Sequence, residues 1–177
     1  MQLQVIKIQK AVHDVLSPAG FKKHRTVWIR DLPEVRQVVA LDRGSWGTRC
    51  WFEFGANVRK VCDDPKPRFY QLHLRWSDEQ LMTKAERLAW IDLSNLERDM
   101  ILPKHCIGKT VPSAISPEYR AGKFADVAHR YILPTLATVD SINKIKSLID
   151  DPSRWKSWPY LSGDREVVKK KLHVLWD

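Results

Sequence analysis

The first segment of the chain has apolar residues at the spacing of a helix. They recur every three or four positions, at Val5, Ile8, Val12, Val15 and Leu16. One face of an α-helix has this period, and Pro18 and Gly20 after it are typical of a helix end. The pattern therefore predicts a helix over residues 5–16 that buries one face.

From residue 20 to residue 58 the apolar period changes to two, which is typical of strands. Three alternating runs lie at residues 26–30, 35–41 and 50–58, and turn residues separate them. A fourth alternating run occupies residues 69–76 after a loop rich in Asp and Pro. Four consecutive strands joined by short turns predict an antiparallel meander sheet.

The C-terminal half has helical signals. Residues 77–117 carry conflicting patterns and are predicted to be irregular. Ser116, Pro117 and Glu118 then combine a capping residue, a first-turn proline and a first-turn acid, which predicts a helix start. Pro134 is predicted to end or kink that helix. A further helix follows over residues 139–149, where apolar residues again have helical spacing.

These elements predict an α+β fold with an N-terminal helix, a four-stranded antiparallel meander sheet and C-terminal helices packed on it. The length of 177 residues and the 44% hydrophobic content are sufficient for one such core. We expect residues 1–150 to form a single domain. Residues 151–177 are expected to form a Trp-rich extension with a basic amphipathic helix, packed on the same domain.

The cysteines and the apolar runs bear on location. Three cysteines, Cys50, Cys62 and Cys106, leave one unpaired in any set of internal disulfides, which favours reduced thiols. The N-terminus does not resemble a signal peptide, and no apolar stretch approaches the roughly 20 residues that span a bilayer. A cytoplasmic protein without integral membrane association is expected.

The formal net charge of +9 favours an acidic partner. The excess of Lys and Arg is spread along the chain, and no basic tail is present. A nucleic-acid-binding protein usually concentrates its cations on one face or segment, so the charge alone does not identify one.

Several short motifs, in this order, resemble a bacterial family catalogued as domain of unknown function 4304. They are Gly20-Phe21-Lys22-Lys23, Trp28-Ile29-Arg30, Ser45-Trp46-Gly47, the run from Phe52 to Gly55, His73-Leu74-Arg75 and Tyr131-Ile132-Leu133-Pro134. The resemblance covers roughly residues 1–150. It implies a small α+β protein of bacterial origin, and the family name states no activity.

Linear signatures of catalysis are absent from the sequence. No CxxC, HxxxH or HExxH motif occurs, and neither common phosphate-binding loop is present, so no metal and no cofactor are expected. His105 and Cys106 are adjacent, which suits a shared metal poorly. The sequence leans away from an enzyme and identifies no catalytic residue. An enzyme built from distant residues stays an alternative, with Cys106 or His73 as candidate groups.

A candidate binding face lies opposite the side of the third strand that carries Cys50, Phe52 and Phe54. If the strands register simply, its members are Trp28, Arg30, Arg49, Trp51, Glu53, His73 and Arg75. Trp and Arg anchor protein interfaces, and the same residue types can stack on single-stranded nucleic acid. The alternative is that helices cover this face and that the tryptophans belong to the core.

A second candidate is the basic helix of the extension, with Lys169, Lys170, Lys171 and Trp176. Such a helix can dock on a partner, or it can pack its apolar side on its own domain. Taken together, the sequence predicts a non-enzymatic binding module for a protein partner with an acidic surface. A role as an immunity or defence-system accessory protein is suggested by analogy only. Nucleic-acid binding through the sheet face and an enzyme are the alternatives.

Overall fold

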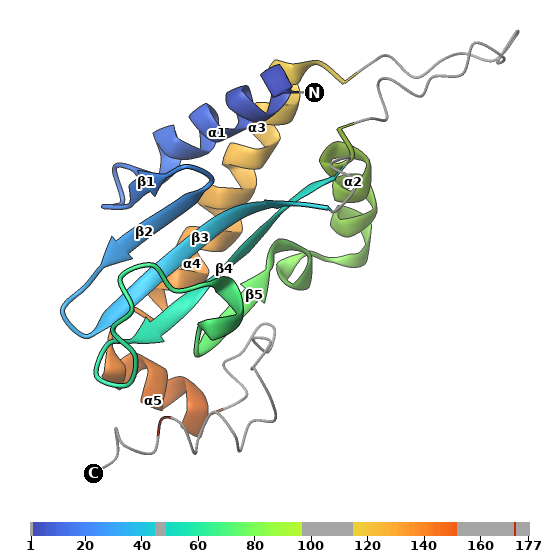
Figure 1. The fold of residues 1–177 in the computed structure, drawn as a ribbon. Coiled ribbons are helices and arrows are strands. Elements are labelled where there is room, and N and C mark those ends of the chain that lie inside the picture. The colour runs from blue at the N-terminus through green and yellow to red at the C-terminus, as the bar shows by residue number, and fades with distance from the viewer. Residues whose placement is uncertain (1, 45–48, 97–114, 152–171, 173–177) are drawn as a thin grey trace, which may run out of the picture.

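An N-terminal helix and an antiparallel sheet form the first half of the fold in the computed structural model, which describes residues 2–44, 49–96, 115–151 and 172 (Figure 1). The helix is α1 (Gln2–Leu16), and the strands are β1 (Lys22–His24), β2 (Val27–Asp31), β3 (Val35–Arg43), β4 (Cys50–Val58) and β5 (Leu74–Ser77). All neighbouring strands are antiparallel and follow in chain order. The predicted meander and N-terminal helix are therefore confirmed.

Helices make up most of the second half. They are the short η1 (Phe69–Gln71) and η2 (Asp78–Leu81), then α2 (Lys84–Ser94), α3 (Pro117–Val127), the π-helical η3 (Ala128–Ile132), α4 (Leu133–Ala137) and α5 (Ile142–Asp150). The predicted α+β class with C-terminal helices on the sheet is confirmed. None of the helices in the described ranges is long and apolar enough to cross a bilayer.

The sheet has five strands rather than the predicted four. The additional strand, β1, has three exposed polar residues and no apolar alternation, so the pattern gave no sign of it. Its pairing with β2 comes from a tight hairpin at Arg25 and Thr26. The predicted strand over 69–76 is also divided, because residues 69–71 form η1 and only residues 74–77 pair with β4.

Residues 77–117 were predicted to be irregular, and for residues 84–94 this prediction is wrong. Thr83 caps α2 by accepting the Glu86 amide, and the Glu86 side chain accepts the Thr83 amide in return. This reciprocal capping box satisfies backbone donors that the first helical turn leaves without partners. The spacing of Thr83 and Glu86 was therefore a signal that the sequence contained.

Pro134 does not end the helical segment that begins with α3. The chain widens into the π-helical turn η3 immediately before the proline, with the Leu133 amide bonded to the Ala128 carbonyl. One further turn, α4, continues past Pro134. A π turn lets the helix accommodate a residue that has no amide donor, and such turns occur often at functional sites.

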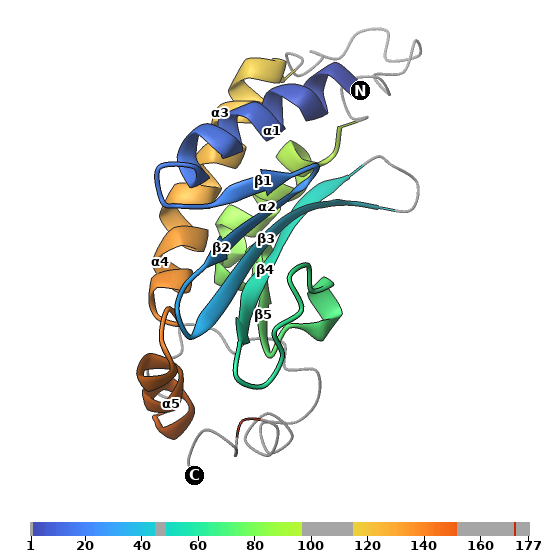
Figure 2. The same ribbon diagram turned by 60° about the vertical axis from the view of Figure 1, so that its left-hand side comes forward.

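The two faces of the sheet have different surroundings (Figure 2). Helices α1, α3 and α4 lie on one face, where they bury the large apolar side chains of the sheet. The strand register places Trp28, Val39, Phe54 and Trp76 in one row on this helix-covered face. All four are at most 2% exposed, and Phe54 and Trp76 stack with their ring centroids 5.9 Å apart. The main core therefore lies between this face and the helices.

The other face, which we call the helix-free face, is covered only in part. The segment between β4 and β5 crosses it, and Leu72 packs there with Ile29 and Val38 in a small second cluster. Gly55 makes this close approach feasible, because a β-carbon at Gly55 would lie 3.0 Å from Leu72 Cδ1. The remaining area of this face is open toward β1.

Gln37 connects the sheet to two helix ends. Its buried Nε2 donates to the carbonyl of Leu136 in the last turn of α4, at 2.7 Å, and to that of Val139 just beyond it, at 3.3 Å. Its Oε1 accepts from Arg30 Nε at 2.9 Å, and Arg30 Nη1 donates to the Ala19 carbonyl just after α1. These bonds give side-chain donors to carbonyls at helix ends, among them the Leu136 carbonyl, which also accepts from the Val139 amide.

We predict that Gln37→Glu lowers the free energy of unfolding by about 3 kcal/mol, because a carboxylate cannot donate to the two carbonyls and would be buried against them. Urea unfolding measures the change. Gln71→Glu is the matched control, because the exposed Gln71 only accepts from the Arg68 amide, which a carboxylate also does. Equal, small effects of both substitutions would contradict the role of Gln37 as a donor.

Asp78 joins β4 to α2 in the interior. Its fully buried carboxylate accepts from the Phe52 amide at 2.9 Å, the Trp90 indole at 3.0 Å and the Glu79 amide at 2.8 Å. Burial raises the pKa of Asp78 from 3.8 to about 7, because loss of hydration outweighs the three donors that favour the charged form. The folded state therefore binds a proton at Asp78 more tightly than the unfolded state does.

This linkage gives a prediction about pH. The stability contributed by the bound proton is complete below the unfolded pKa and is lost as the pH rises through about 7. From about pH 4 to about pH 8, the free energy of unfolding of the wild type should fall relative to that of Asp78→Asn, which does not titrate. Denaturant unfolding at several pH values measures both free energies, and a wild-type value that rises with pH relative to that of Asp78→Asn would contradict the raised pKa.

Candidate binding site

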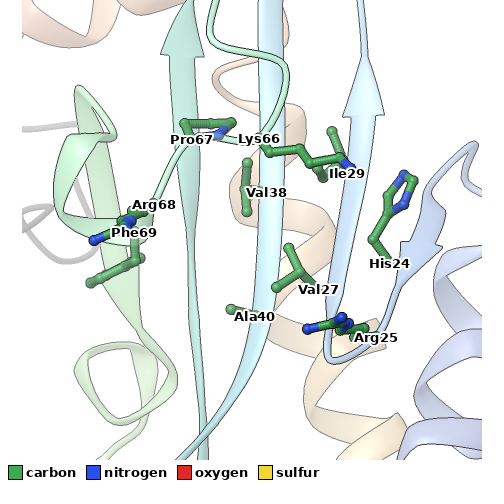
Figure 3. Close-up of a pocket in the computed structure, with 10 residues that line it drawn as sticks. All are labelled: His24, Arg25, Val27, Ile29, Val38, Ala40, Lys66, Pro67, Arg68 and Phe69. Carbon is green, nitrogen blue, oxygen red and sulfur yellow. The ribbon is translucent and has the colours of Figure 1, made fainter.

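A groove of about 570 Å³ lies on the helix-free face (Figure 3). Its floor is apolar and consists of Val27 and Ile29 from β2 with Val38 and Ala40 from β3. These four residues face the same side because each is two positions from the next along its strand, and Val27 pairs with Ala40 as Ile29 does with Val38. The volume is in the range of sites that enclose a small ligand or a few side chains of a partner.

The rim of this groove is basic on both sides. His24 and Arg25 lie on one side, in β1 and the hairpin that follows it, while Lys66 and Arg68 come from the loop before η1 on the other (Figure 3). All four side chains are exposed, and none of the residues that line the groove is acidic. The groove therefore combines an apolar floor with positive charge at its edges.

Local contacts hold the loop wall in place. The Arg68 amide donates to Gln71 Oε1 at 2.7 Å, and the Arg68 guanidinium donates to the Tyr70 hydroxyl at 3.0 Å. The Arg75 guanidinium carbon lies 5.6 Å from the centroid of the Phe69 ring, which fits a cation–π contact. The wall that carries Arg68 is thus positioned by side chains of the same loop and of β5.

Carboxylates near this loop are engaged elsewhere. Asp31 pairs with Arg36 Nε at 2.6 Å, and Asp63 pairs with Arg36 at 3.3 Å and with Arg59 at 2.9 Å. The Asp64 side chain accepts from the Lys66 amide, which fixes the loop without neutralising the Lys66 ammonium. None of the ion pairs of these carboxylates therefore involves a cation of the groove rim.

Arg25 has an unusual backbone for an arginine. Its φ of +58° lies in the left-handed region, and Arg25 is the one residue other than glycine with a positive φ in the described part of the chain. The tight β1–β2 hairpin requires this conformation, which Gly and Asn adopt more readily than a long side chain does. The side chain at this turn lines the groove.

The predicted sheet-face residues do not share one face. Trp51 and Glu53 lie on the helix-free face with Arg75, because the register pairs Glu53 with Ala40 and Arg75 with Gly55. Trp28 and Arg30 lie on the opposite, helix-covered face, so their predicted place beside Trp51 is wrong. Three consecutive apolar residues, 27–29, hid the true direction, and the largest of them is the one that the helices bury.

Trp28 and Arg30 have structural contacts. Trp28 is 0% exposed within the main core. Arg30 holds Gln37 and the Ala19 carbonyl, and its guanidinium carbon lies 4.9 Å from the Phe21 ring centroid. Burial lowers the pKa of Arg30, and nearby Asp140 opposes this shift. For Trp28, the alternative that the tryptophan belongs to the core is confirmed.

Arg49 and His73 are also held within the fold. Arg49 donates to the Ser94 hydroxyl at 3.0 Å and forms an ion pair with Glu79. His73 is 7% exposed, and its Nδ1 accepts from the Val58 amide at 3.0 Å. These contacts attach the two ends of β4 to neighbouring elements.

Glu53 and Asp42 are acidic residues next to the groove, and they contact each other. Glu53 pairs across the strands with Ala40, but it does not line the groove. Burial raises the pKa of Glu53, while its hydrogen bond with Trp51 and the charge of Arg75 oppose the shift. Glu53 therefore belongs to a Trp51, Glu53 and Arg75 cluster beside the groove, and its role in binding stays a prediction.

The other predicted groups give no described reactive site. Lys169, Lys170, Lys171 and Trp176, as well as His105 and Cys106, lie outside the described residues. Burial raises the pKa of the Cys50 thiol to about 11, which keeps it protonated at neutral pH. Within residues 2–44, 49–96, 115–151 and 172, no three His, Cys, Asp or Glu side chains are grouped to hold a metal ion.

A smaller hollow of about 200 Å³ lies between α2 and α3. Its central carboxylate, Glu86, accepts from the Tyr131 hydroxyl and caps α2 at Thr83. These hydrogen bonds lower the pKa of Glu86 to about 2. The carboxylate of this hollow is thus hydrogen-bonded within the fold, whereas the basic residues at the rim of the groove on the helix-free face are exposed.

Most groove residues were not singled out in the sequence. The run from Lys66 to Tyr70 contains two basic residues followed by two aromatic ones in a proline-rich loop, and this was the available signal for one wall. Arg25 gave no signal, because its position in a left-handed turn is evident only from the backbone.

We predict that Trp28→Ala and Trp51→Ala have very different effects on stability. Trp28→Ala should lower the free energy of unfolding by about 3–5 kcal/mol, because it leaves a cavity in the core. Trp51→Ala should cost within about 1 kcal/mol, because its side chain is half-buried near the beginning of β4. Urea unfolding of both variants measures the costs, and a larger loss for Trp51→Ala would contradict the assigned faces.

The comparisons with known proteins identify a family and no close relative. A family model described as Domain of unknown function (DUF4304) matches residues 12–104. The match extends from the middle of α1 past α2, so it includes the whole sheet and every residue that lines the groove. Neither the curated proteins nor the solved structures contain a match. The chain belongs to the DUF4304 family.

Proposed function

We propose that this protein is a non-enzymatic binding module that docks a protein partner with an acidic surface on its helix-free face. The observation that carries the proposal is the groove, in which an apolar floor lies between basic rims that include no acidic residue. Burying the floor favours association, and the rims select a partner of negative charge. The net charge of +9 acts in the same direction at longer range.

A protein surface suits this groove because its charge and apolar area are close together. Arg25 and Arg68 lie on opposite sides of a floor only two strands wide. An acidic side chain next to an apolar one on a partner would contact both parts at once. Such a combination is typical of the centre and rim of a protein interface.

Single-stranded nucleic acid is the second candidate. Tyr70 is 58% exposed beside Arg68, which offers one stacking surface next to the basic rim. Trp28, a member of the predicted binding face, is buried in the core and cannot stack on a base. A nucleic-acid partner would give a steep loss of affinity with added salt, because binding releases counterions from its phosphates.

The cellular setting belongs to the proposal as well. A cytoplasmic location is favoured by the odd number of cysteines, and an accessory or immunity role in a bacterial defence system is an analogy. The basic groove favours a partner that presents acid, rather than a nuclease whose own active site is basic.

We predict that Ala40→Glu abolishes capture of the partner from the source cell, because it places a carboxylate on the half-exposed floor of the groove. Affinity capture with quantitative mass spectrometry compares the variant with the wild type, and circular dichroism checks that it is folded. Leu88→Glu is the matched control, because it adds the same charge at a 61% exposed apolar residue on α2. Capture of the same acidic protein by Ala40→Glu and by the wild type would contradict the proposal.

A further inference from the structure

We infer that Arg25 is a specificity-determining residue. Its side chain binds an acidic group of the partner, and an apolar group next to that acidic group occupies the floor of the groove. This inference rests on the proposed function and names the partner chemistry: an acidic side chain next to an aromatic or aliphatic side chain on one segment of the partner. The charge complementarity of the lining supports this occupant, because the groove has three permanent cations and no carboxylate.

The backbone conformation of Arg25 is unfavourable for most residues. A φ of +58° places the β-carbon of Arg25 close to its own carbonyl, which disfavours this conformation for most L-residues. Asn and Gly fit tight hairpins of this kind better, so the fold alone does not explain an arginine there. Strained positions of this type persist where a side chain serves binding.

The side chain of Arg25 lies at the rim of the groove. Arg25 is exposed, yet it lines the groove next to Val27 rather than extending away from the sheet (Figure 3). Across the floor, Arg68 belongs to the opposite wall, and the Lys66 side chain extends from the same loop toward Ile29 (Figure 3). An acidic group above Val27 and Ala40 would therefore meet a guanidinium from the hairpin side, and a guanidinium can bind a carboxylate through two parallel hydrogen bonds.

The accessible apolar area of the groove floor lies near Arg25. Ile29 and Val38 are 7% and 2% exposed, whereas Val27 and Ala40 are half-buried at the end of the groove nearer Arg25. The uncovered apolar area is therefore next to the hairpin cation. A ligand that joins an anion directly to an apolar body fits this arrangement, and a hydrated anion alone would leave the floor exposed.

The test uses two fluorescent probes that differ in one charged group. 8-Anilinonaphthalene-1-sulfonate carries an anion on an aromatic body, and N-phenyl-1-naphthylamine has the same rings without the sulfonate. We expect saturable 1:1 binding of the sulfonate to the full chain, weakened about tenfold by Arg25→Asn, with less than about a twofold change for the neutral probe. Arg25→Lys keeps the charge but loses the planar pair of donors, so it should weaken sulfonate binding less than Arg25→Asn does.

A second readout separates binding from folding. Asn fits the left-handed turn better than Arg, so Arg25→Asn should unfold at a higher urea concentration than the wild type. Stability should thus rise while binding of the anionic probe falls. Unchanged sulfonate binding by Arg25→Asn, or an equal loss for both probes, would overturn the inference.

The inference and the proposed function fail in different ways. If Ala40→Glu loses the protein partner but Arg25→Asn binds the sulfonate normally, the binding face stands and the role of Arg25 is overturned. If Arg25→Asn weakens sulfonate binding selectively but Ala40→Glu still captures the same partner, the anion site is supported and the proposed docking face is overturned.

Discussion

The register of the β-meander determines which side chains meet the helices and which meet solvent. One cross-strand row, Trp28, Val39, Phe54 and Trp76, lies under the helices, and burial of these large side chains holds the register in place. A slip of one residue in β2 would move Trp28 to the helix-free face and Ile29 into the core. The groove exists because this alignment leaves smaller residues, Val27 and Ala40, on the other side.

The polar side chains of the two sheet faces also differ in their partners. On the helix-covered face, Arg30 and Gln37 bond each other and the helix-end carbonyls, so their charge and hydrogen bonds serve the fold. On the helix-free face, Arg25 and Arg68 stay at the surface around an apolar floor. The same residue types therefore serve the fold on one face and remain exposed on the other. The strained hairpin conformation of Arg25 fits this division, because it reduces stability at a residue that lines the groove.

Much of the fold could be predicted because burial has a clear period in the sequence. The spacing in α1 and the alternation in β4 each place apolar residues on one side, and the structure buries those sides. The pairing of β1 could not be predicted, since its three residues are polar and their partner is set by a turn. The direction of Trp28 was also ambiguous, since apolar residues flank it on both sides. The groove depends on a loop, a hairpin and two strands that meet only in three dimensions, so its residues shared no linear pattern.

The helix-free face, and not a helical surface, is the proposed binding site for the acidic partner. Amide chemical shifts of the ¹⁵N-labelled protein, followed by NMR during titration with 8-anilinonaphthalene-1-sulfonate, test this most directly. We predict progressive shifts at Arg25, Val27, Ala40 and Arg68, with little change at Glu86 and other residues of the hollow between α2 and α3. Shifts concentrated in that hollow, with the groove amides unchanged, would contradict the account.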